Sequence, residues 1–376
     1  MSQDKNEINL KAMYRTKTEG SFPKNIEIMG KHWTKVEDLR YGTNPHQPAA
    51  FYRPVESDKV FLGDYKILKT GKSGLSQTNL EDLHHAFGIL KFLKQPACAV
   101  MKHCNPSGVA VRREGQTLTD VYIRARDADS QAAFGGVAAF NVEVDESIAN
   151  EIMQTVVEGV AAPSFTNEAL TVFNQFEKYR RNKEIRIIQV PPLDRLPKYT
   201  DESIYTWEMK VFDDGSIILV QPYLTKIKSI DDFMIASTEH PKKGKIESTV
   251  IPSHRELEDL LFAWYVNIHV RSNGVVIAKN GQTIAVGTGQ QDRVGAVEQA
   301  VDKAQKKYKG NETLEDAVLA SDGFFPFADA IEAAIRVGIR AIAQPGGSVN
   351  DYEIIETANK AGVAMLFTGE RCFSHH

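Results

Sequence analysis

Cysteine is scarce in this chain, which carries Cys98, Cys104 and Cys372 in 376 residues. A low and odd number argues against a disulfide framework and suits a reducing compartment. The sequence also has no apolar run that approaches the roughly 18 residues of a membrane-spanning helix. Its first residues are polar and lack the apolar core of a signal peptide. We therefore expect a cytoplasmic protein with reduced thiols and no membrane partner.

Several ligand-binding motifs are missing as well. The absence of a Gly-x-x-x-x-Gly-Lys-Ser/Thr segment excludes a P-loop, and residues 287–292 lack the third glycine of a dinucleotide-binding turn. The pairs His84-His85 and His375-His376 are adjacent, and neighbouring residues on a helix point about 100° apart, so each pair offers at most one metal ligand. The ligand set of the zinc deaminases is absent too. We expect no tightly bound metal.

The chain has no strong charge of either sign, since its formal net charge is −4. That value gives no general attraction to nucleic acid or anionic lipid, so we expect neither as a partner. An anionic ligand would need a locally basic pocket. Hydrophobic residues make up 42% of the chain, as in an ordinary globular protein. The length favours two domains over one.

The predicted organisation is an N-terminal extension, residues 1–38, followed by two lobes, 39–200 and 201–376. Strands alternating with helices predict an α/β fold with mixed sheets. The predicted helices cover 79–93 (with Asn79 as N-cap), 120–128, 146–158, 255–270, 294–308, 330–337 and 352–361. The predicted strands cover 97–101, 339–343 and 363–367, and residues 133–140 predict a glycine-containing turn that enters a further apolar strand. Hairpins are predicted over 207–220 and 274–286.

A basic pair that follows a wholly apolar run is the first candidate for chemistry. The run 97–101 predicts a buried strand, most naturally a parallel one, and residues 102–108 predict a polar turn. Open α/β sheets bind ligands at such strand ends. His103 can accept a proton near neutral pH, and Lys102 can stabilise a developing oxyanion. A solvated basic turn is the alternative that spacing alone leaves open.

Two other kinds of segment are candidates. The glycine turns at 133–136 and 344–348 allow a ligand to approach the backbone closely, or are ordinary tight turns. Residues 324–329 hold three aromatic side chains just before a predicted helix. They predict either a wall for a planar heterocycle or a hydrophobic staple at the helix start.

Taken in order, several segments resemble the AICAR transformylase family, the formyl-transferring part of the bifunctional purine biosynthesis protein. The resemblance covers residues 39–376 and implies two cytidine-deaminase-like α/β/α lobes in a homodimer with sites at the subunit interface. The segments that carry it are 39–47, 102–108, 133–141, 271–273, 286–293, 320–327, 344–348 and 365–368.

The resemblance also implies a reaction and its residues. In this reaction 10-formyltetrahydrofolate, the folate co-substrate, donates a formyl group to the amine of 5-aminoimidazole-4-carboxamide ribonucleotide, a step of IMP biosynthesis. Lys102, His103 and Asn273 would be catalytic, with His103 assisting loss of the amine proton and Lys102 stabilising the oxyanion. The implied substrate-binding residues are Arg40, Tyr41, Gly135, Glu158, Phe324 and Arg371. The implied folate-binding residues are Pro326, Phe327 and Asp329.

The sequence departs from the family pattern at a few points. Only about 38 residues precede the match, so we expect a separate IMP cyclohydrolase to act downstream. Ala328 replaces a frequent arginine beside the folate site, and Ala330 replaces a polar residue or glycine. These two changes motivate an alternative, a non-catalytic nucleotide-binding regulator that has lost folate chemistry. A zinc deaminase relative is a third reading, which the missing ligands disfavour.

Overall fold

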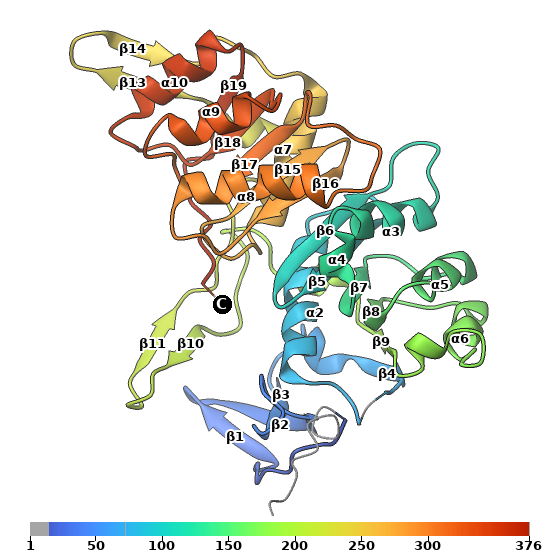
Figure 1. Cartoon of the computed structure of the whole chain (residues 1–376). Helices are drawn as coiled ribbons and strands as arrows, with labels where there is room; N and C mark the ends of the chain where they lie inside the picture. Colours follow the sequence, from blue (N-terminus) through green and yellow to red (C-terminus); the bar gives the residue numbers. More distant parts are fainter. Residues whose placement is uncertain (1–14, 72, 376) are drawn as a thin grey trace, which may run out of the picture.

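The computed structural model describes residues 15–71 and 73–375. They form a mixed α/β protein around one 12-stranded sheet, so the predicted fold class is confirmed (Figure 1). The helices of the described residues are α2 (Gln77–Leu90), α3 (Leu118–Asp127), α4 (Ser130–Ala133), α5 (Glu146–Ile152), α6 (Asn167–Phe173), α7 (His254–Asn267), α8 (Arg293–Lys306), α9 (Asp329–Ile335) and α10 (Asp351–Lys360). None of them has the length and apolar character that crossing a membrane requires.

The large sheet has the strand order β12-β19-β18-β17-β15-β16-β6-β5-β7-β8-β9-β4. Its strands are β4 (Lys66–Lys69), β5 (Ala97–Lys102), β6 (Asn105–Val111), β7 (Gly136–Phe140), β8 (Val157–Ala162), β9 (Arg186–Gln189), β12 (Met234–Ile235), β15 (Val275–Lys279), β16 (Gln282–Gly287), β17 (Val318–Ser321), β18 (Ala341–Gln344) and β19 (Ala364–Phe367). The strands outside it are β1 (Asn25–Ile28), β2 (Lys31–Asp38), β3 (Ala50–Pro54), β10 (Glu208–Val211), β11 (Ile217–Val220), β13 (Ser237–His240) and β14 (Gly244–Glu247).

The same order of elements occurs twice along the chain. A helix, an antiparallel hairpin, a further helix and then parallel strands alternating with helices run from α2 to β9, and again from α7 to β19. In each copy the first strand of the hairpin also pairs antiparallel with the strand that follows the hairpin. Thus β5 pairs with β7, and β15 pairs with β17. The two copies meet where Gln282 of β16 pairs with Ala110 of β6. In Figure 1 the second copy lies above the first.

Strand β5 is antiparallel to both of its neighbours, so the prediction of a parallel strand was wrong. The run is wholly apolar because helices cover both faces of the sheet here. Ala97, Ala99 and Met101 join the core on one face, while Cys98 and Val100 join the core on the other. Apolar residues on both faces of a strand indicate that both faces are buried, and they do not indicate the direction of the strand.

Three local predictions need correction. Residues 105–108 belong to strand β6 and not to the polar turn. Helix α2 begins earlier than predicted, with Ser76 as its N-cap and Asn79 completing a capping box. Helix α5 ends at Ile152, and residues 157 and 158 belong to β8, so Glu158 projects from a strand.

Part of the segment expected to be an extension is ordered as sheet. Strands β1 and β2 pair antiparallel with each other, and β2 pairs with β3, so the expected boundary at residue 39 falls inside one three-stranded sheet. The first 14 residues of that expected extension, and His376 of the terminal histidine pair, lie outside the described residues.

Candidate active site

The basic pair lies at the tip of the β5–β6 hairpin. Lys102 pairs with Asn105, so His103 and Cys104 alone form the turn. Both have positive φ angles, 53° and 62°, as a two-residue type I′ turn requires. The Nζ atom of Lys102 donates a hydrogen bond of 2.6 Å to the backbone oxygen of Phe134, and the side chain of His103 is exposed. The chain therefore presents His103 to the outside with Lys102 tethered beside it.

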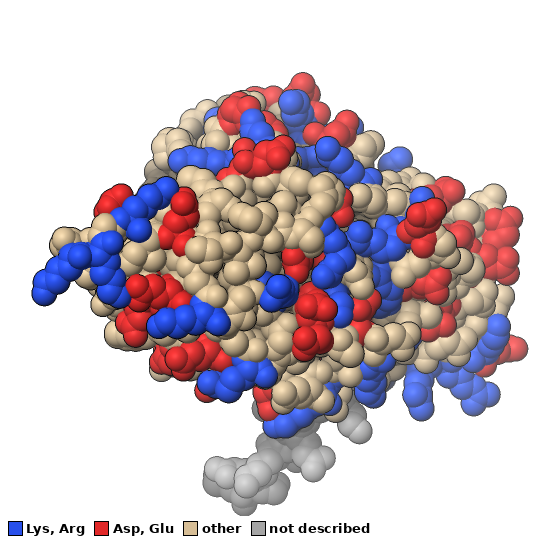
Figure 2. Space-filling model, turned by 90° about the horizontal axis from the view of Figure 1, so that it is seen from above, with Lys and Arg blue, Asp and Glu red and all other residues tan. Residues whose placement is uncertain are grey.

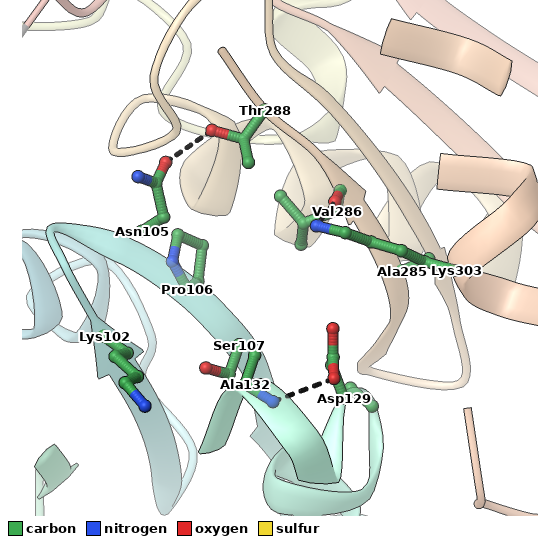
Figure 3. Close-up of a pocket in the computed structure, with 11 residues that line it drawn as sticks. Lys102, Asn105, Pro106, Ser107, Asp129, Ala132, Ala285, Val286, Thr288 and Lys303 are labelled. Atoms are coloured by element: carbon green, nitrogen blue, oxygen red, sulfur yellow. Dashed lines mark hydrogen bonds between the residues drawn. The ribbon is translucent and has the colours of Figure 1, made fainter. Parts of the chain in front are cut away.

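Contacts on two sides hold this hairpin tip. On one side the amide of Cys104 donates to Oδ1 of Asp82 in α2 at 2.7 Å. On the other side Oδ1 of Asn105 accepts from the amide of Arg271 at 3.1 Å and from the hydroxyl of Thr288 at 2.6 Å (Figure 3). The tip is thus fixed between a helix of the first copy and two loops of the second. Sequence reasoning missed the roles of Asp82 and Thr288, because their partners lie far away in the sequence.

Three of the expected substrate-binding residues gather near a buried arginine. Nη2 of Arg40 donates to the hydroxyl of Tyr41 at 2.9 Å. Glu158 accepts from Nδ2 of Asn79 at 3.3 Å and lies 3.7 Å from Nη1 of Arg186. Burial lowers the pKa of Arg186 to about 10, and the charge of Arg40 adds to this effect. Arg40 and Arg186 are 2% and 1% exposed, so two guanidinium groups share a buried position suited to an anion.

Gly135 lies close to Lys102 of the β5–β6 hairpin. Its φ is 72°, and its amide donates to the backbone oxygen of Val156 at 2.8 Å. A Cβ atom at this position would lie 3.9 Å from Nζ of Lys102. Glycine therefore permits the left-handed backbone and leaves space beside the lysine.

Asn273 lies on the loop that follows Arg271. Its Nδ2 donates to the backbone oxygen of Gln290 at 2.8 Å, and its Oδ1 accepts from Nη2 of Arg293 at 2.7 Å. Arg293 also pairs with Asp322, and both are buried. This pair fixes the amide of Asn273, and sequence reasoning missed both of its members.

The remaining expected residues lie within the second copy or just after it. Phe324 and Phe327 are 45% and 60% exposed, and the backbone oxygen of Pro326 accepts from Nδ2 of Asn350 at 2.7 Å. Asp329 is exposed at the first residue of α9. The guanidinium of Arg371 lies 4.7 Å from the ring of Phe373.

The C-terminal segment ties Arg371 to the Asn273 loop. The amide of Cys372 donates to the backbone oxygen of Asp322 at 3.0 Å, and the amide of Ser374 donates to the hydroxyl of Ser272 at 3.2 Å. The contacts thus place Gly135 beside Lys102 in the first copy, and they place Asn273 and the segment of Arg371 near Asp322. The hydrogen bond between Asn105 and Arg271 connects the two regions.

A small cavity adjoins the hairpin, as Figure 3 shows. It measures about 70 Å³ and is lined by Lys102, Ser107, Asp129 and Lys303 among others. Ligand pockets usually measure about 300–1,000 Å³, so this cavity is too small for a nucleotide. A nucleotide at the basic pair would have to occupy the open surface in front of His103.

Charged groups on the visible surface are mixed in sign. On the face drawn in Figure 2, Lys and Arg side chains are interspersed with Asp and Glu side chains. Within residues 15–71 and 73–375, no three or more His, Cys, Asp and Glu side chains are grouped so that they could hold a metal ion.

Fold and site together define a mixed α/β protein in which polar side chains gather at the tip of the β5–β6 hairpin. The model of the AICARFT/IMPCHase bienzyme family matches residues 6–303, and the chain belongs to this family. The resemblance seen in the sequence is thereby confirmed.

Relatives from several bacteria bear the name bifunctional purine biosynthesis protein PurH. The one from Acetivibrio thermocellus is 41% identical over 358 residues, which are 95% of this chain and 62% of the relative. The one from Oceanobacillus iheyensis is 36% identical over 362 residues, 96% of this chain and 63% of the relative. The one from Anoxybacillus flavithermus is 40% identical over 349 residues, 93% of this chain and 61% of the relative. The chain thus spans less than two thirds of the length of these relatives.

Proposed function

We propose that this chain transfers a formyl group from 10-formyltetrahydrofolate to the amine of 5-aminoimidazole-4-carboxamide ribonucleotide. The observation that carries the proposal is the exposed His103 beside the tethered Lys102, in a chain that belongs to the AICARFT/IMPCHase bienzyme family. The buried Arg40–Arg186 cluster supports an anionic substrate.

The two side chains of the hairpin tip have complementary roles. The amine of the substrate is a poor nucleophile, because its lone pair is delocalised into the imidazole ring and the carboxamide. His103 accepts a proton from this amine as the new C–N bond forms. The bond between the formyl carbon and the folate nitrogen then breaks, and that nitrogen takes up a proton, which releases tetrahydrofolate. The positive charge of Lys102 stabilises the negative charge that develops on the formyl oxygen. Asn273, held by Arg293, orients the substrate beside them.

Arginine side chains suit the phosphate of the substrate. A guanidinium group donates two parallel hydrogen bonds to a phosphate, which an ammonium group cannot do. Arg40 and Arg371 take this role in the proposal. Glu158, Tyr41 and Gly135 contact the ribose and the ring, and the backbone at Phe324 contacts the carboxamide.

The formyl donor requires a surface for a planar pteridine ring. Phe327 offers an exposed aromatic face, and Pro326 precedes it. Asp329 offers an exposed carboxylate that can accept hydrogen bonds from the ring nitrogens. These residues fit the folate head group, which supplies the activated formyl group when it is bound.

We also propose that the chain works as a homodimer in the cytoplasm. The β10–β11 hairpin projects from the body of the molecule (Figure 1). Its apolar side chains are exposed, Met209, Val211, Ile217 and Leu219 among them. An isolated two-stranded hairpin is marginally stable in water, so a second copy that buries these side chains would stabilise it. The unpaired thiols Cys98, Cys104 and Cys372 suit a reducing compartment.

A steady-state assay of tetrahydrofolate release tests the catalytic role of His103. The variant His103→Asn is suitable because asparagine tolerates a positive φ but is not a base. We expect its kcat to fall by about 10²–10⁴-fold, the usual contribution of general base catalysis. His254→Asn, at an exposed position on α7, is the matched control and keeps full turnover. Near-normal turnover of His103→Asn would refute the proposed mechanism.

A further inference from the structure

The turn that carries the basic pair has an unusual backbone. His103 and Cys104 both adopt positive φ, a conformation that glycine and asparagine accept readily and that other residues adopt at a cost. Such a turn persists only where its surroundings hold it. Its stability therefore depends on contacts from outside the hairpin.

Asp82 supplies one such contact. In a two-residue turn the hairpin ladder ends at the flanking pair, here Lys102 and Asn105, so the amide of Cys104 needs another acceptor. Oδ1 of Asp82 accepts it at 2.7 Å, across 22 positions of sequence. Asp82 is 4% exposed and lies in the interior of α2. A buried carboxylate on a helix thus accepts a hydrogen bond from the strained turn.

The position of Asp82 is itself well defined. The capping box of Ser76 and Asn79 fixes the start of α2, and Leu83 and Phe87 anchor the helix in the core. Because α2 packs against β5, a shift of the helix would move the hairpin tip with it.

The charges around Asp82 come from three elements. Glu81 lies next to it on α2, Glu158 lies on β8, and Lys102 lies on β5, while the thiol of Cys104 is also close. Burial and the two glutamates raise the pKa of Asp82 to about 7, and the Cys104 amide and Lys102 oppose this rise. The charge of this carboxylate therefore changes near neutral pH.

We propose that Asp82 is the positioning residue of the catalytic hairpin: by accepting the amide of Cys104 it holds the turn that sets where Lys102 and His103 point. The ionised carboxylate is the stronger acceptor, so the anchor weakens as Asp82 takes up a proton. The expected effect of Asp82 on kcat rests on the proposed formyl transfer. Its expected effect on the conformation of the turn does not depend on that function.

The structural arm uses the scarcity of cysteine. Selective ¹⁵N-cysteine labelling yields amide signals only from Cys98, Cys104 and Cys372, and Cys104→Ser assigns the signal of Cys104. We expect the chemical shift of the Cys104 amide in the wild type to change with pH, with a midpoint near 7. Asp82→Asn, which keeps an acceptor oxygen, should remove this titration, and Asp82→Ala should shift the signal at every pH. In Glu81→Gln, on the same helix, the titration should persist with a lower midpoint, because Glu81 raises the pKa of Asp82.

The kinetic arm compares the same variants. We expect kcat to fall in the order wild type, Asp82→Asn, Asp82→Ala, with a loss of up to about 10²-fold, because a misplacement near 1 Å can cost that much. The KM for the nucleotide should change by no more than roughly twofold, because phosphate binding lies elsewhere. The part of the acidic limb that Asp82 contributes should be lost in Asp82→Asn, while the part that comes from His103 as the base remains.

Two results would overturn the proposal. One is an unchanged Cys104 amide signal in Asp82→Ala that retains the wild-type melting temperature. The other is wild-type kcat in that variant. If the wild type itself transfers no formyl group, the proposed function fails, and the amide signal of Cys104 alone then decides the role of Asp82.

Discussion

Buried charge at Asp82 makes the stability of this fold depend on pH. Its pKa is about 7 in the folded chain, well above the ordinary value for an aspartate. Between these two values the unfolded chain ionises at this residue while the folded chain stays protonated. Below about pH 4 Asp82 is protonated in both states and does not destabilise the fold. The free energy of unfolding then falls progressively as the pH rises to about 7.

Asp82→Asn should remove this loss. Between pH 5 and pH 8, we expect the free energy of unfolding of Asp82→Asn to rise relative to that of the wild type by about 3 kcal/mol, at about 1.4 kcal/mol for each unit of pH up to the pKa. Urea unfolding at both pH values measures the difference. A constant difference between the two proteins would show that Asp82 is ionised throughout.

At the scale of residues, the sequence singled out residues that stand in motifs and not the residues that support them. Lys102, His103 and Arg40 stand in motifs that the family resemblance identifies. Asp82 and Arg186 act through contacts between segments far apart in the chain. Such contacts leave no local pattern in the sequence. A single charged residue in a predicted helix or strand is therefore expected to face the solvent.

At the scale of elements, periodicity located the helices and strands well but not their ends or directions. The helix predicted over 146–158 ends at Ile152, because the β-branched residues from Thr155 to Val157 favour a strand. The direction of β5 could not be predicted, since double burial makes antiparallel and parallel strands look alike. Asn79 was correctly associated with the start of α2, but as the third residue of the helix.

The capping box of α2 should contribute measurably to stability. Ser76→Ala removes the side-chain oxygen that accepts the amide of Asn79 at 3.3 Å. We expect the free energy of unfolding to fall by about 1 kcal/mol, the typical value for such a cap. Thr78→Ala, two residues further into the same helix, should not destabilise, because alanine is the better helix former. Equal effects of the two substitutions in chemical denaturation would contradict this account of the cap.

At the scale of the whole molecule, the repeat of elements from α2 to β9 and from α7 to β19 supports a division into two lobes. The sequence suggests this division through its length and through the low regularity near residue 200, and the division stays a prediction. It could not show that a single continuous sheet passes through both copies, because that depends on the pairing of Gln282 with Ala110. We propose that the lobes carry complementary parts of the site.

The β10–β11 hairpin tests the proposed dimer. Its register places Met209, Val211, Ile217 and Leu219 on one face, and Ile218 on the other. Leu219→Asp should convert the dimer to a monomer and reduce turnover, because a buried charge without a partner opposes association. Ile218→Asp is the matched control from the opposite face and should dissociate less. Sedimentation velocity distinguishes the two, and a stable Leu219→Asp dimer would place the interface elsewhere.

The central claim is formyl transfer to a nucleotide amine, and a labelled donor tests it most directly. The purified chain would be mixed with 10-formyltetrahydrofolate carrying ¹³C in its formyl group and with 5-aminoimidazole-4-carboxamide ribonucleotide. Mass spectrometry and ¹³C NMR would then locate the label. We predict that it appears on the exocyclic amine of the nucleotide, and that His103→Asn slows its appearance. Label that stays in the folate, or that leaves only as formate, would contradict the proposed function.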